Sequence, residues 1–270
     1  MACTSGETVT KRRSWVWILL GIVLLAYPIV ATLWNDAQLE KSARAYREEV
    51  ETIEPPAELE RLWRQAQDYN ASLEHHALPP EETSPGFAEY LDTLNAPETG
   101  GKMARISIEA IGVDLPVYHT TRPQVLYHGA GHMFGSDLPV GGEGTNTVIT
   151  AHTGMVNASM FDHLPLLKEG DLVTLEVLNH TLYYAVTGRT VVAPDRWEAV
   201  TYERGIDKLT LITCTPYGIN SDRLLVEAHR VPGPQEQTRR AWRLSWWMVA
   251  DLVAIAVVLV LWIFLERRKR

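Results

Sequence analysis

Long apolar runs lie near both ends of the chain. Residues 14–34 read SWVWILLGIVLLAYPIVATLW, roughly 20 positions without a charge, which is enough to cross a hydrocarbon core about 30 Å thick. Residues 244–265 form a second run, which is interrupted by Asp251. Trp residues stand near the ends of both runs, where interfacial aromatic side chains are common. The pattern predicts two transmembrane helices. A cleaved signal peptide is the alternative for the first run, but no clear small-residue cleavage site follows it.

A helical pattern occupies residues 35–73, directly after the first run. The text QLEKSARAYREEV is rich in helix-forming residues, and a proline pair interrupts the pattern after it. Beyond this break, Leu59, Leu62, Trp63 and Ala66 recur at the i, i+3, i+4, i+7 spacing of a helix with one apolar face. The sequence therefore predicts a helical stalk that packs on a neighbouring domain.

Strand signals dominate residues 102–232. Short apolar or alternating segments are separated by turn residues, as in MARISIEAIGVDLPVYHT, TNTVITAHT, LVTLEVLNHTLYYAVTGRTVV, LTLITCT and RLLVEAHRV. Between the second and third segments, SMFDHLPLL predicts a single helical turn. Many short strands with few helices favour a closed barrel or a sandwich. Residues 74–101, rich in Pro and Gly, separate this β domain from the stalk, and residues 233–243 link it to the second apolar run.

The net charge of −8 gives no sign of a nucleic-acid partner. Basic residues are instead concentrated at positions 11–13, before the first apolar run, and at 267–270, after the second. Positively charged flanks of membrane helices tend to stay in the cytoplasm. We therefore expect residues 1–13 and 266–270 to be cytoplasmic and the domain between the helices to be extracytoplasmic. The three arginines of residues 233–243 argue weakly against this topology.

Cysteine is rare in this chain, which contains Cys3 and Cys214. The predicted topology places them on opposite sides of the membrane, so we expect no disulfide between them. Exported domains usually pair their cysteines or avoid them, which makes a lone thiol at position 214 unusual. A buried thiol can also serve as a small apolar side chain, so the count alone leaves a structural and a reactive role open.

The residues around Cys214 favour a reactive role. The strand LTLITC ends at this cysteine, a turn-rich stretch follows, and the strand RLLVEAHRV begins at Arg223. In a simple antiparallel hairpin centred on residues 218–219, Cys214 and Arg223 face each other on one side of the sheet. A guanidinium beside a thiol can favour the thiolate or donate to an oxyanion during acyl transfer. His152 directly follows the strand NTVITA, at an equivalent strand end, and is the candidate acid–base partner.

These segments resemble the core of the sortases. The stretches YHGAGHMFGSDLPVGGEGTNTVITAHTG, KEGD and LTLITCTPYGINSDRLLVEAHR carry the family pattern of a His after a strand, then T-C-T-P-Y-G-x-N, then an Arg. The pattern falls on His152, residues 213–220 and Arg223, and the similarity covers roughly residues 103–231. The two apolar runs and the helices before the β domain resemble class C, the pilin-polymerising sortases.

The resemblance implies an eight-stranded β-barrel and transpeptidation at an LPXTG-type sorting signal. Separately, we expect no cofactor and no metal, and we interpret the acidic residues Glu81, Glu82 and Glu89 as a solvated loop rather than a calcium site. Cys214 is then expected to attack the Thr carbonyl, which forms a thioester and releases the Gly-side fragment. His152 is expected to protonate the leaving amine and to deprotonate the incoming one, while Arg223 holds the substrate or stabilises the oxyanion. Thr213 and Thr215 are expected to line the site. In class C the acceptor is typically a lysine side chain of a pilin.

Class C sortases usually carry a lid, a loop over the active site that an Asp-Pro-aromatic motif anchors. Residues 74–101 occupy the corresponding place here, and no Asp-Pro-Phe or Asp-Pro-Trp occurs among them. Phe87 is the candidate for the aromatic role, with His75, His76 or Glu81 for the polar one. An open loop, or a loop with another anchor, is the alternative.

Other functions fit parts of the pattern. A sortase of another class would attach surface proteins to cell-wall cross-bridges, although the stalk and the second apolar run favour class C. A non-catalytic membrane-anchored scaffold would need no reactive thiol. A papain-like hydrolase is disfavoured because its nucleophile lies early in the domain. The chain also shows no ligand spacing typical of zinc sites.

Overall fold

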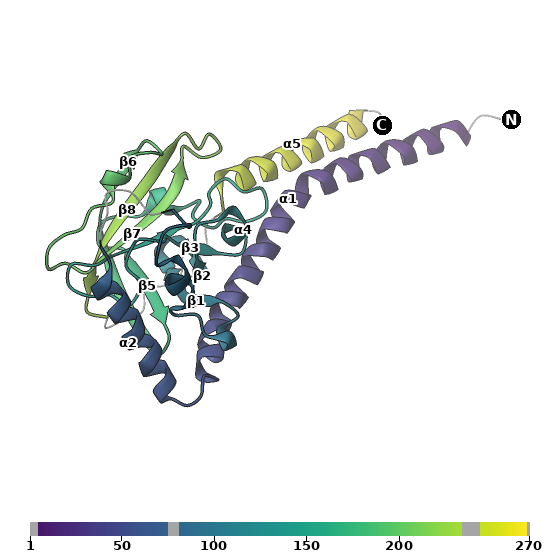
Figure 1. Cartoon of the computed structure of the whole chain (residues 1–270). Helices are drawn as coiled ribbons and strands as arrows, with labels where there is room; N and C mark the ends of the chain where they lie inside the picture. The colour runs from purple at the N-terminus through teal and green to yellow at the C-terminus, as the bar shows by residue number, and fades with distance from the viewer. Residues whose placement is uncertain (1–4, 75–80, 234–243, 269–270) are drawn as a thin grey trace. The chain divides into compact units, whose positions relative to one another are not determined.

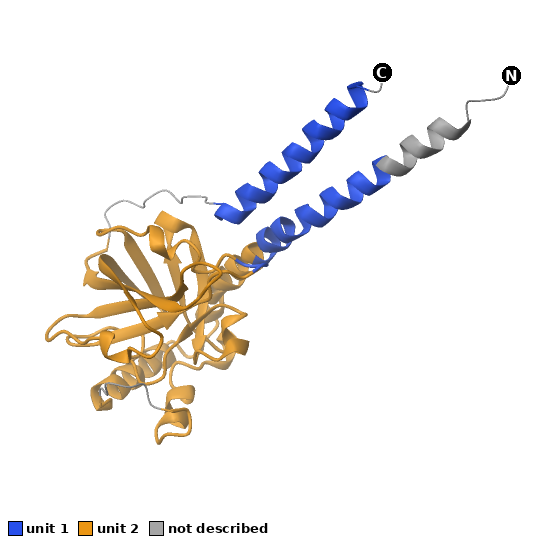
Figure 2. Ribbon diagram, turned by 90° about the horizontal axis from the view of Figure 1, so that it is seen from above, with its two compact units in different colours: residues 1–35, 156–158, 244–270 blue, residues 36–155, 159–243 orange. Residues whose placement is uncertain are grey.

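The computed structural model describes residues 5–74, 81–233 and 244–268, and the chain divides into two compact units (Figure 2). The helical unit consists of Met1–Asn35, Val156–Ala158 and Leu244–Arg270. The barrel unit consists of Asp36–Met155 and Ser159–Arg243. The helical unit contains the two apolar runs, and the barrel unit contains every strand of the described residues.

Two long helices contain the apolar runs. α1 (Ser5–Glu51) continues without a break from the first predicted span into the first half of the predicted stalk, and α5 (Trp246–Arg268) contains the second run (Figure 1). Both are long and apolar enough to be candidate membrane spans. The other helices are α2 (Ala57–Ser72), α3 (Phe87–Asp92) and α4 (Pro123–Leu126), with 3-10 turns η1 (Pro97–Thr99), η2 (Glu109–Ile111), η3 (Leu164–Leu166) and η4 (Trp197–Ala199).

Eight strands close into a barrel, which confirms the fold that the sequence predicted (Figure 1). They are β1 (Lys102–Ile108), β2 (Val113–His119), β3 (Ala130–His132), β4 (Asn146–Thr150), β5 (Leu172–Val177), β6 (His180–Val192), β7 (Lys208–Thr215) and β8 (Asp222–Val231). Neighbours around the barrel follow the order β1-β2-β3-β4-β7-β8-β6-β5. The β2–β3 and β4–β7 pairs are parallel, and the other pairs are antiparallel.

The burial of the strands distinguishes those with one covered face from those with two. In β5, Val173, Leu175 and Val177 are fully buried and the residues between them are partly exposed, because successive side chains point to opposite faces. β4 and β7 are buried at nearly every position, as expected for strands covered on both faces. Exposure begins only at their last residues, at Thr150 and Cys214. The chain is therefore accessible where these two strands end.

The stalk packs on the barrel through both of its helices. Leu62 and Ala66, two members of the predicted apolar stripe on α2, are buried. On α1, the Tyr46 side chain is almost fully buried, and its hydroxyl donates to Met103 O at 2.9 Å and accepts the Leu178 N–H at 2.8 Å. These contacts fix the barrel-unit part of α1 against β1 and the end of β5.

Candidate active site

The residues that the sequence singled out lie on two neighbouring strands and just beyond the end of a third. β7 lies between β4 and β8 in the barrel, parallel to the first and antiparallel to the second. Thr213, the residue before the cysteine, is 2% exposed, whereas Cys214 is partly exposed and its thiol forms no disulfide. The end of β7 therefore presents a thiol at the rim of the barrel.

The β7–β8 hairpin places Arg223 directly opposite Cys214. This is the register that the sequence predicted, and it puts both side chains on one face of the sheet. The Nη1 atom of Arg223 donates to Asp222 O at 3.0 Å and to Asn220 O at 3.4 Å. A guanidinium has five N–H donors, so these two contacts leave further donors for a substrate or an oxyanion.

The parallel β4–β7 pair brings His152 to the level of the cysteine. Thr150 pairs with Ile212, and the hydrogen bonds continue beyond the end of β4. The Ala151 N–H donates to Ile212 O at 3.2 Å, and Thr213 Oγ1 donates to Ala151 O at 2.8 Å. Ala151 is therefore level with Thr213, and His152 is level with the next residue of β7.

His152, Cys214 and Arg223 consequently form a row across three adjacent strands, which are about 4.8 Å apart in a sheet. The Tyr127 ring lies beside this row, with its centroid 5.6 Å from that of the His152 ring and an angle of 53° between the ring planes. Burial lowers the pKa of His152, which favours the neutral imidazole near neutral pH. A neutral imidazole can accept the proton of a thiol.

The loops that follow His152 and Cys214 are in contact. A Cβ atom added to Gly154 would lie 3.4 Å from the Gly218 nitrogen. Both glycines have a positive φ, +73° and +74°, which side chains of L-residues rarely adopt. The two turns can therefore pack backbone against backbone, and this contact joins the chain segments on either side of the site.

Thr213 and Thr215 flank the thiol in different environments. The Thr213 side chain is buried, and its hydroxyl is bound to the carbonyl of Ala151, where it ties β7 to the chain just before the histidine. Thr215 is partly exposed and pairs with Asp222 at the end of the hairpin. Thr215 thus remains the candidate for lining the site, and Thr213 is placed to support it.

The residues proposed for the polar part of the lid are only partly described. His75 and His76 lie outside the described residues. Glu81 is exposed, and its Oε2 accepts a hydrogen bond from the Thr83 hydroxyl at 3.3 Å.

Phe87, the proposed aromatic residue of the lid, packs on the barrel at the start of α3. Its ring meets the Phe134 ring edge to face, with centroids 5.0 Å apart. The Arg122 guanidinium lies 5.6 Å from the centroid of the Phe87 ring, and its Nε donates to Glu82 Oε2 at 2.6 Å. The segment before α3 is thus attached to the chain around α4, whose next residue is Tyr127.

Tyr90 anchors α3 in the interior. It is fully buried, and its hydroxyl lies 3.0 Å from His132 Nδ1 and accepts the Thr120 N–H at 3.0 Å. Burial lowers the pKa of His132 to about 3, so its imidazole is neutral and carries one N–H. Its Nε2 lies 2.8 Å from Asp137 O, which can only accept, so Nε2 carries the proton. Nδ1 is then an acceptor, and the Tyr90 hydroxyl points its one proton towards Nδ1 and the His132 carbonyl oxygen, each 3.0 Å away. Sequence patterns did not reveal this network, because its members come from separate segments.

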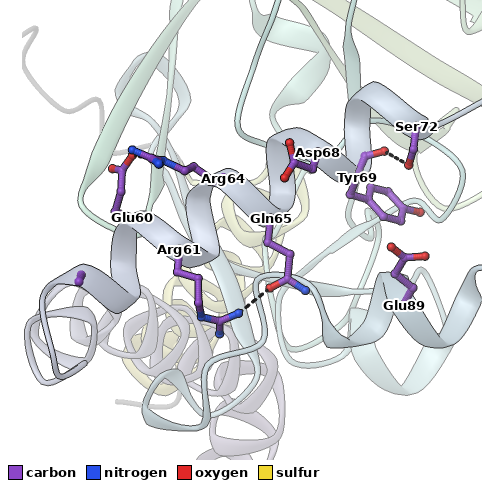
Figure 3. A pocket seen from close by; sticks show the side chains of 9 residues that line it. Glu60, Arg61, Arg64, Gln65, Asp68, Tyr69, Ser72 and Glu89 are labelled. Atoms are coloured by element: carbon purple, nitrogen blue, oxygen red, sulfur yellow. Dashed lines mark hydrogen bonds and ion pairs between the residues drawn. The ribbon is translucent and has the colours of Figure 1, made fainter.

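A groove of about 810 Å³ lies along α2 and beside Glu89 of α3, and its lining does not include His152, Cys214 or Arg223 (Figure 3). It is lined by Ala57, Glu60, Arg61, Arg64, Gln65, Asp68, Tyr69, Ser72 and Glu89. Its arginines pair within the same helix, Arg61 with Glu58 at 2.5 Å and Arg64 with Glu60 at 2.8 Å. We assign it to the solvated surface of α2. Within the described part of the chain, no three His, Cys, Asp or Glu side chains are grouped so that they could hold a metal ion.

Known proteins resemble this chain in sequence and in overall fold. Residues 106–231 match the family model described as the sortase domain. The crystal structure of sortase C-1 from Actinomyces oris is 44% identical, with a TM-score of 0.61, and the match covers 65% of this chain and 99% of that one. The chain belongs to the sortase family. Sortase C from Streptococcus pneumoniae is 38% identical to this sortase, with a TM-score of 0.63 and coverage of 72% of this chain and 97% of that one.

Curated sortases match a shorter part of the molecule. Sortase A from Bacillus anthracis is 35% identical to this sortase over 124 residues, which are 46% of this chain and 57% of the relative. The chain thus spans a little over half the length of the curated relatives it matches. The family assignment agrees with the resemblance found in the sequence, including the closed barrel of eight strands.

Proposed function

We propose that this sortase is a class C cysteine transpeptidase that polymerises pilins, with Cys214 as its nucleophile. The observation that carries the proposal is the row of His152, Cys214 and Arg223 across β4, β7 and β8. The class is supported by its structural relatives, which include sortase C-1 of Actinomyces oris and a pilus-related sortase C of Group B Streptococcus at 37% identity.

In the first half of the reaction, Cys214 accepts the acyl group of an LPXTG-like sorting signal. The Cys214 sulfur attacks the Thr carbonyl carbon while His152, neutral because burial lowers its pKa, takes the thiol proton. The Arg223 guanidinium donates to the oxyanion of the tetrahedral intermediate. The Thr–Gly bond then breaks, His152 returns the proton to the Gly nitrogen, and a thioester remains on the sulfur.

In the second half, a pilin lysine takes the acyl group. Its ε-amine attacks the thioester carbon, and the carbon–sulfur bond breaks as the new isopeptide bond forms. His152 takes a proton from the attacking nitrogen and returns it to the Cys214 sulfur. The enzyme is regenerated, and the pilin polymer is one subunit longer.

We propose that α1 and α5 anchor this site to the cell membrane. The spans are residues 14–34 and 244–265, with the barrel outside and both termini in the cytoplasm. The two candidate spans and the basic residues at positions 11–13 and 267–270 support this topology. Reporter fusions along the chain test this topology, and a cytoplasmic location of residue 214 would overturn it.

Replacement of the thiol tests the chemistry. We expect Cys214→Ala to abolish both the acyl-enzyme and the pilin polymers, measured by mass spectrometry and by immunoblotting in cells without other sortases. Cys3→Ser, which removes the other cysteine, is the matched control and should retain both. Continued polymerisation by Cys214→Ala would refute the assignment.

The alternative product is a protein attached to peptidoglycan. It is favoured by the curated relatives, which are named Sortase A. Mass spectrometry of the product linkage distinguishes the two: a lysine isopeptide bond between pilins supports class C, and a cell-wall fragment supports the alternative.

A further inference from the structure

Three polar residues lie on one face of α1, close to the end of the first apolar run. Thr32, Asn35 and Asp36 are spaced i, i+3 and i+4, so their side chains project from the same side of the helix. Thr32 Oγ1 donates to Val156 O at 3.2 Å, and Asn35 Nδ2 donates to Asn157 O at 2.9 Å. The first two members of the face thus bind carbonyl groups of consecutive residues.

The Asp36 carboxylate completes this polar face. Its Oδ1 accepts the Ser159 N–H at 2.8 Å. Burial raises the pKa of Asp36, and hydrogen bonds from the Ser159 backbone and side chain oppose that shift. Thr32 and Asn35 thus bind carbonyl groups within the helical unit, and Asp36 binds Ser159 within the barrel unit. The contact of Asp36 with Ser159 fixes the far end of the loop of residues 153–160 to the barrel-unit part of α1.

This loop begins directly after His152. At its start, Asp162 Oδ1 accepts hydrogen bonds from the Thr153 hydroxyl at 3.0 Å and from the Gly154 N–H at 2.8 Å. The Phe161 N–H donates to the carbonyl of His152 itself at 3.0 Å. The loop thus holds the histidine at one end by internal bonds, and α1 binds it at the other end.

We propose that Asp36, in the barrel-unit part of α1, positions His152 by holding the loop that follows it. The inference rests on the proposed function, because it takes His152 as the acid–base group. Asp36 need not touch the substrate, since it acts through Ser159 at the far end of this loop.

The test uses the full chain in lipid nanodiscs with a fluorogenic sorting-signal peptide and an amine acceptor. We expect Asp36→Ala to lower kcat by about tenfold with KM within about twofold, since small misplacements of a reacting group are costly. Asp36→Asn keeps an acceptor oxygen for Ser159 and should restore most of the activity. The rate at which iodoacetamide modifies Cys214 should stay unchanged in both. Gln38→Ala, an exposed position on the same helix, is the matched control.

Hydrogen exchange of residues 153–161 provides a readout that does not depend on catalysis. Faster exchange of this loop in Asp36→Ala, together with the fall in kcat, supports the inference. Unchanged exchange, or faster exchange with a normal kcat, overturns it. A wild-type enzyme without Cys214-dependent transfer would instead refute the proposed function, and the exchange data would still show whether α1 holds the loop.

Discussion

Arg223 has two sets of partners at the residue scale. Its backbone pairs with Cys214 across the hairpin, and its Nη1 atom donates to the carbonyls of Asn220 and Asp222 in its own turn. These bonds orient the guanidinium before a substrate arrives. A donor that is oriented in advance stabilises a developing negative charge without reorganising during the reaction.

We therefore expect Arg223→Ala to lower the rate of thioester formation by about 10²–10³-fold, as for the loss of other oxyanion donors. The rate of thioester formation by Arg223→Lys should lie between those of this variant and the wild type, because an ammonium keeps the charge without the planar fork of donors. Rapid-quench measurement of the acyl-enzyme tests both. Arg204→Ala, at an exposed position, should behave as the wild type. Equal rates in Arg223→Ala and the wild type would remove Arg223 from the mechanism.

The sequence predicted the spatial placement of some site residues but not of others. The Cys214–Arg223 register follows from one hairpin, so counting positions from its centre was sufficient, and the register is confirmed. The placement of His152 depends on the pairing of two strands distant in the chain, which no local pattern specifies. Tyr127 could not be predicted, because it reaches His152 only through the tertiary fold. The catalytic roles stay predictions until the variants are measured.

At the scale of elements, α3 is short but bound to the barrel on two sides. Tyr90 fixes it to β3 through His132. Phe87 fixes its first turn to Phe134 and lies beside Arg122. If the segment before α3 acts as the lid, its stability at this end depends on Phe87.

We expect Phe87→Ala to loosen residues 81–87 and to raise the rate of Cys214 modification by a bulky thiol reagent severalfold. The physical reason is the loss of the buried part of the ring and of its contact with Phe134. Stopped-flow labelling of the full chain measures the rate, with Thr83→Ala as the control for an exposed residue of the same segment. Rates equal to that of the wild type would argue against Phe87 as an anchor.

Most elements were predictable where their pattern is local and repeated. The stripe on α2 follows the helical period, β5 and the first half of β6 alternate, and β7 and β8 are recognisable as apolar segments bounded by turn residues. β3 was missed because three residues are too few to show a period, and its parallel pairing with β2 follows a crossover through α4. The continuity of α1 from the apolar run into the stalk reflects the absence of a helix-breaking residue between residues 35 and 51.

At the scale of the whole molecule, buried histidines make stability depend on pH. Burial lowers the pKa of His132 from about 6.5 to about 3 and lowers that of His119 in the same direction. Below pH 6.5 the unfolded chain binds protons that the folded chain does not. The free energy of unfolding should therefore decrease as the pH falls from about 6.5 towards 3, by up to about 1.4 kcal/mol per pH unit for each such group.

Denaturant titrations of the full chain in detergent, repeated over this pH range, measure the slope. His132→Gln should be less stable near pH 7, because it disturbs the hydrogen bonds to Tyr90 and Asp137. Its free energy of unfolding should nevertheless change less with pH than that of the wild type. His128→Gln, which removes an exposed imidazole, should keep the slope of the wild type. A slope unchanged by His132→Gln would contradict the linkage.

The hydrogen bond between Thr213 and Ala151 joins residues 62 positions apart in the chain. Two further strands, β5 and β6, lie between them in the sequence, so the β4–β7 pair belongs to the slow, non-local part of folding. If His152 is the base, as proposed, a newly made chain carries its thiol before it has assembled that base beside it. The thiol then becomes reactive only when the barrel closes, and incompletely folded molecules would form no thioester with a sorting signal.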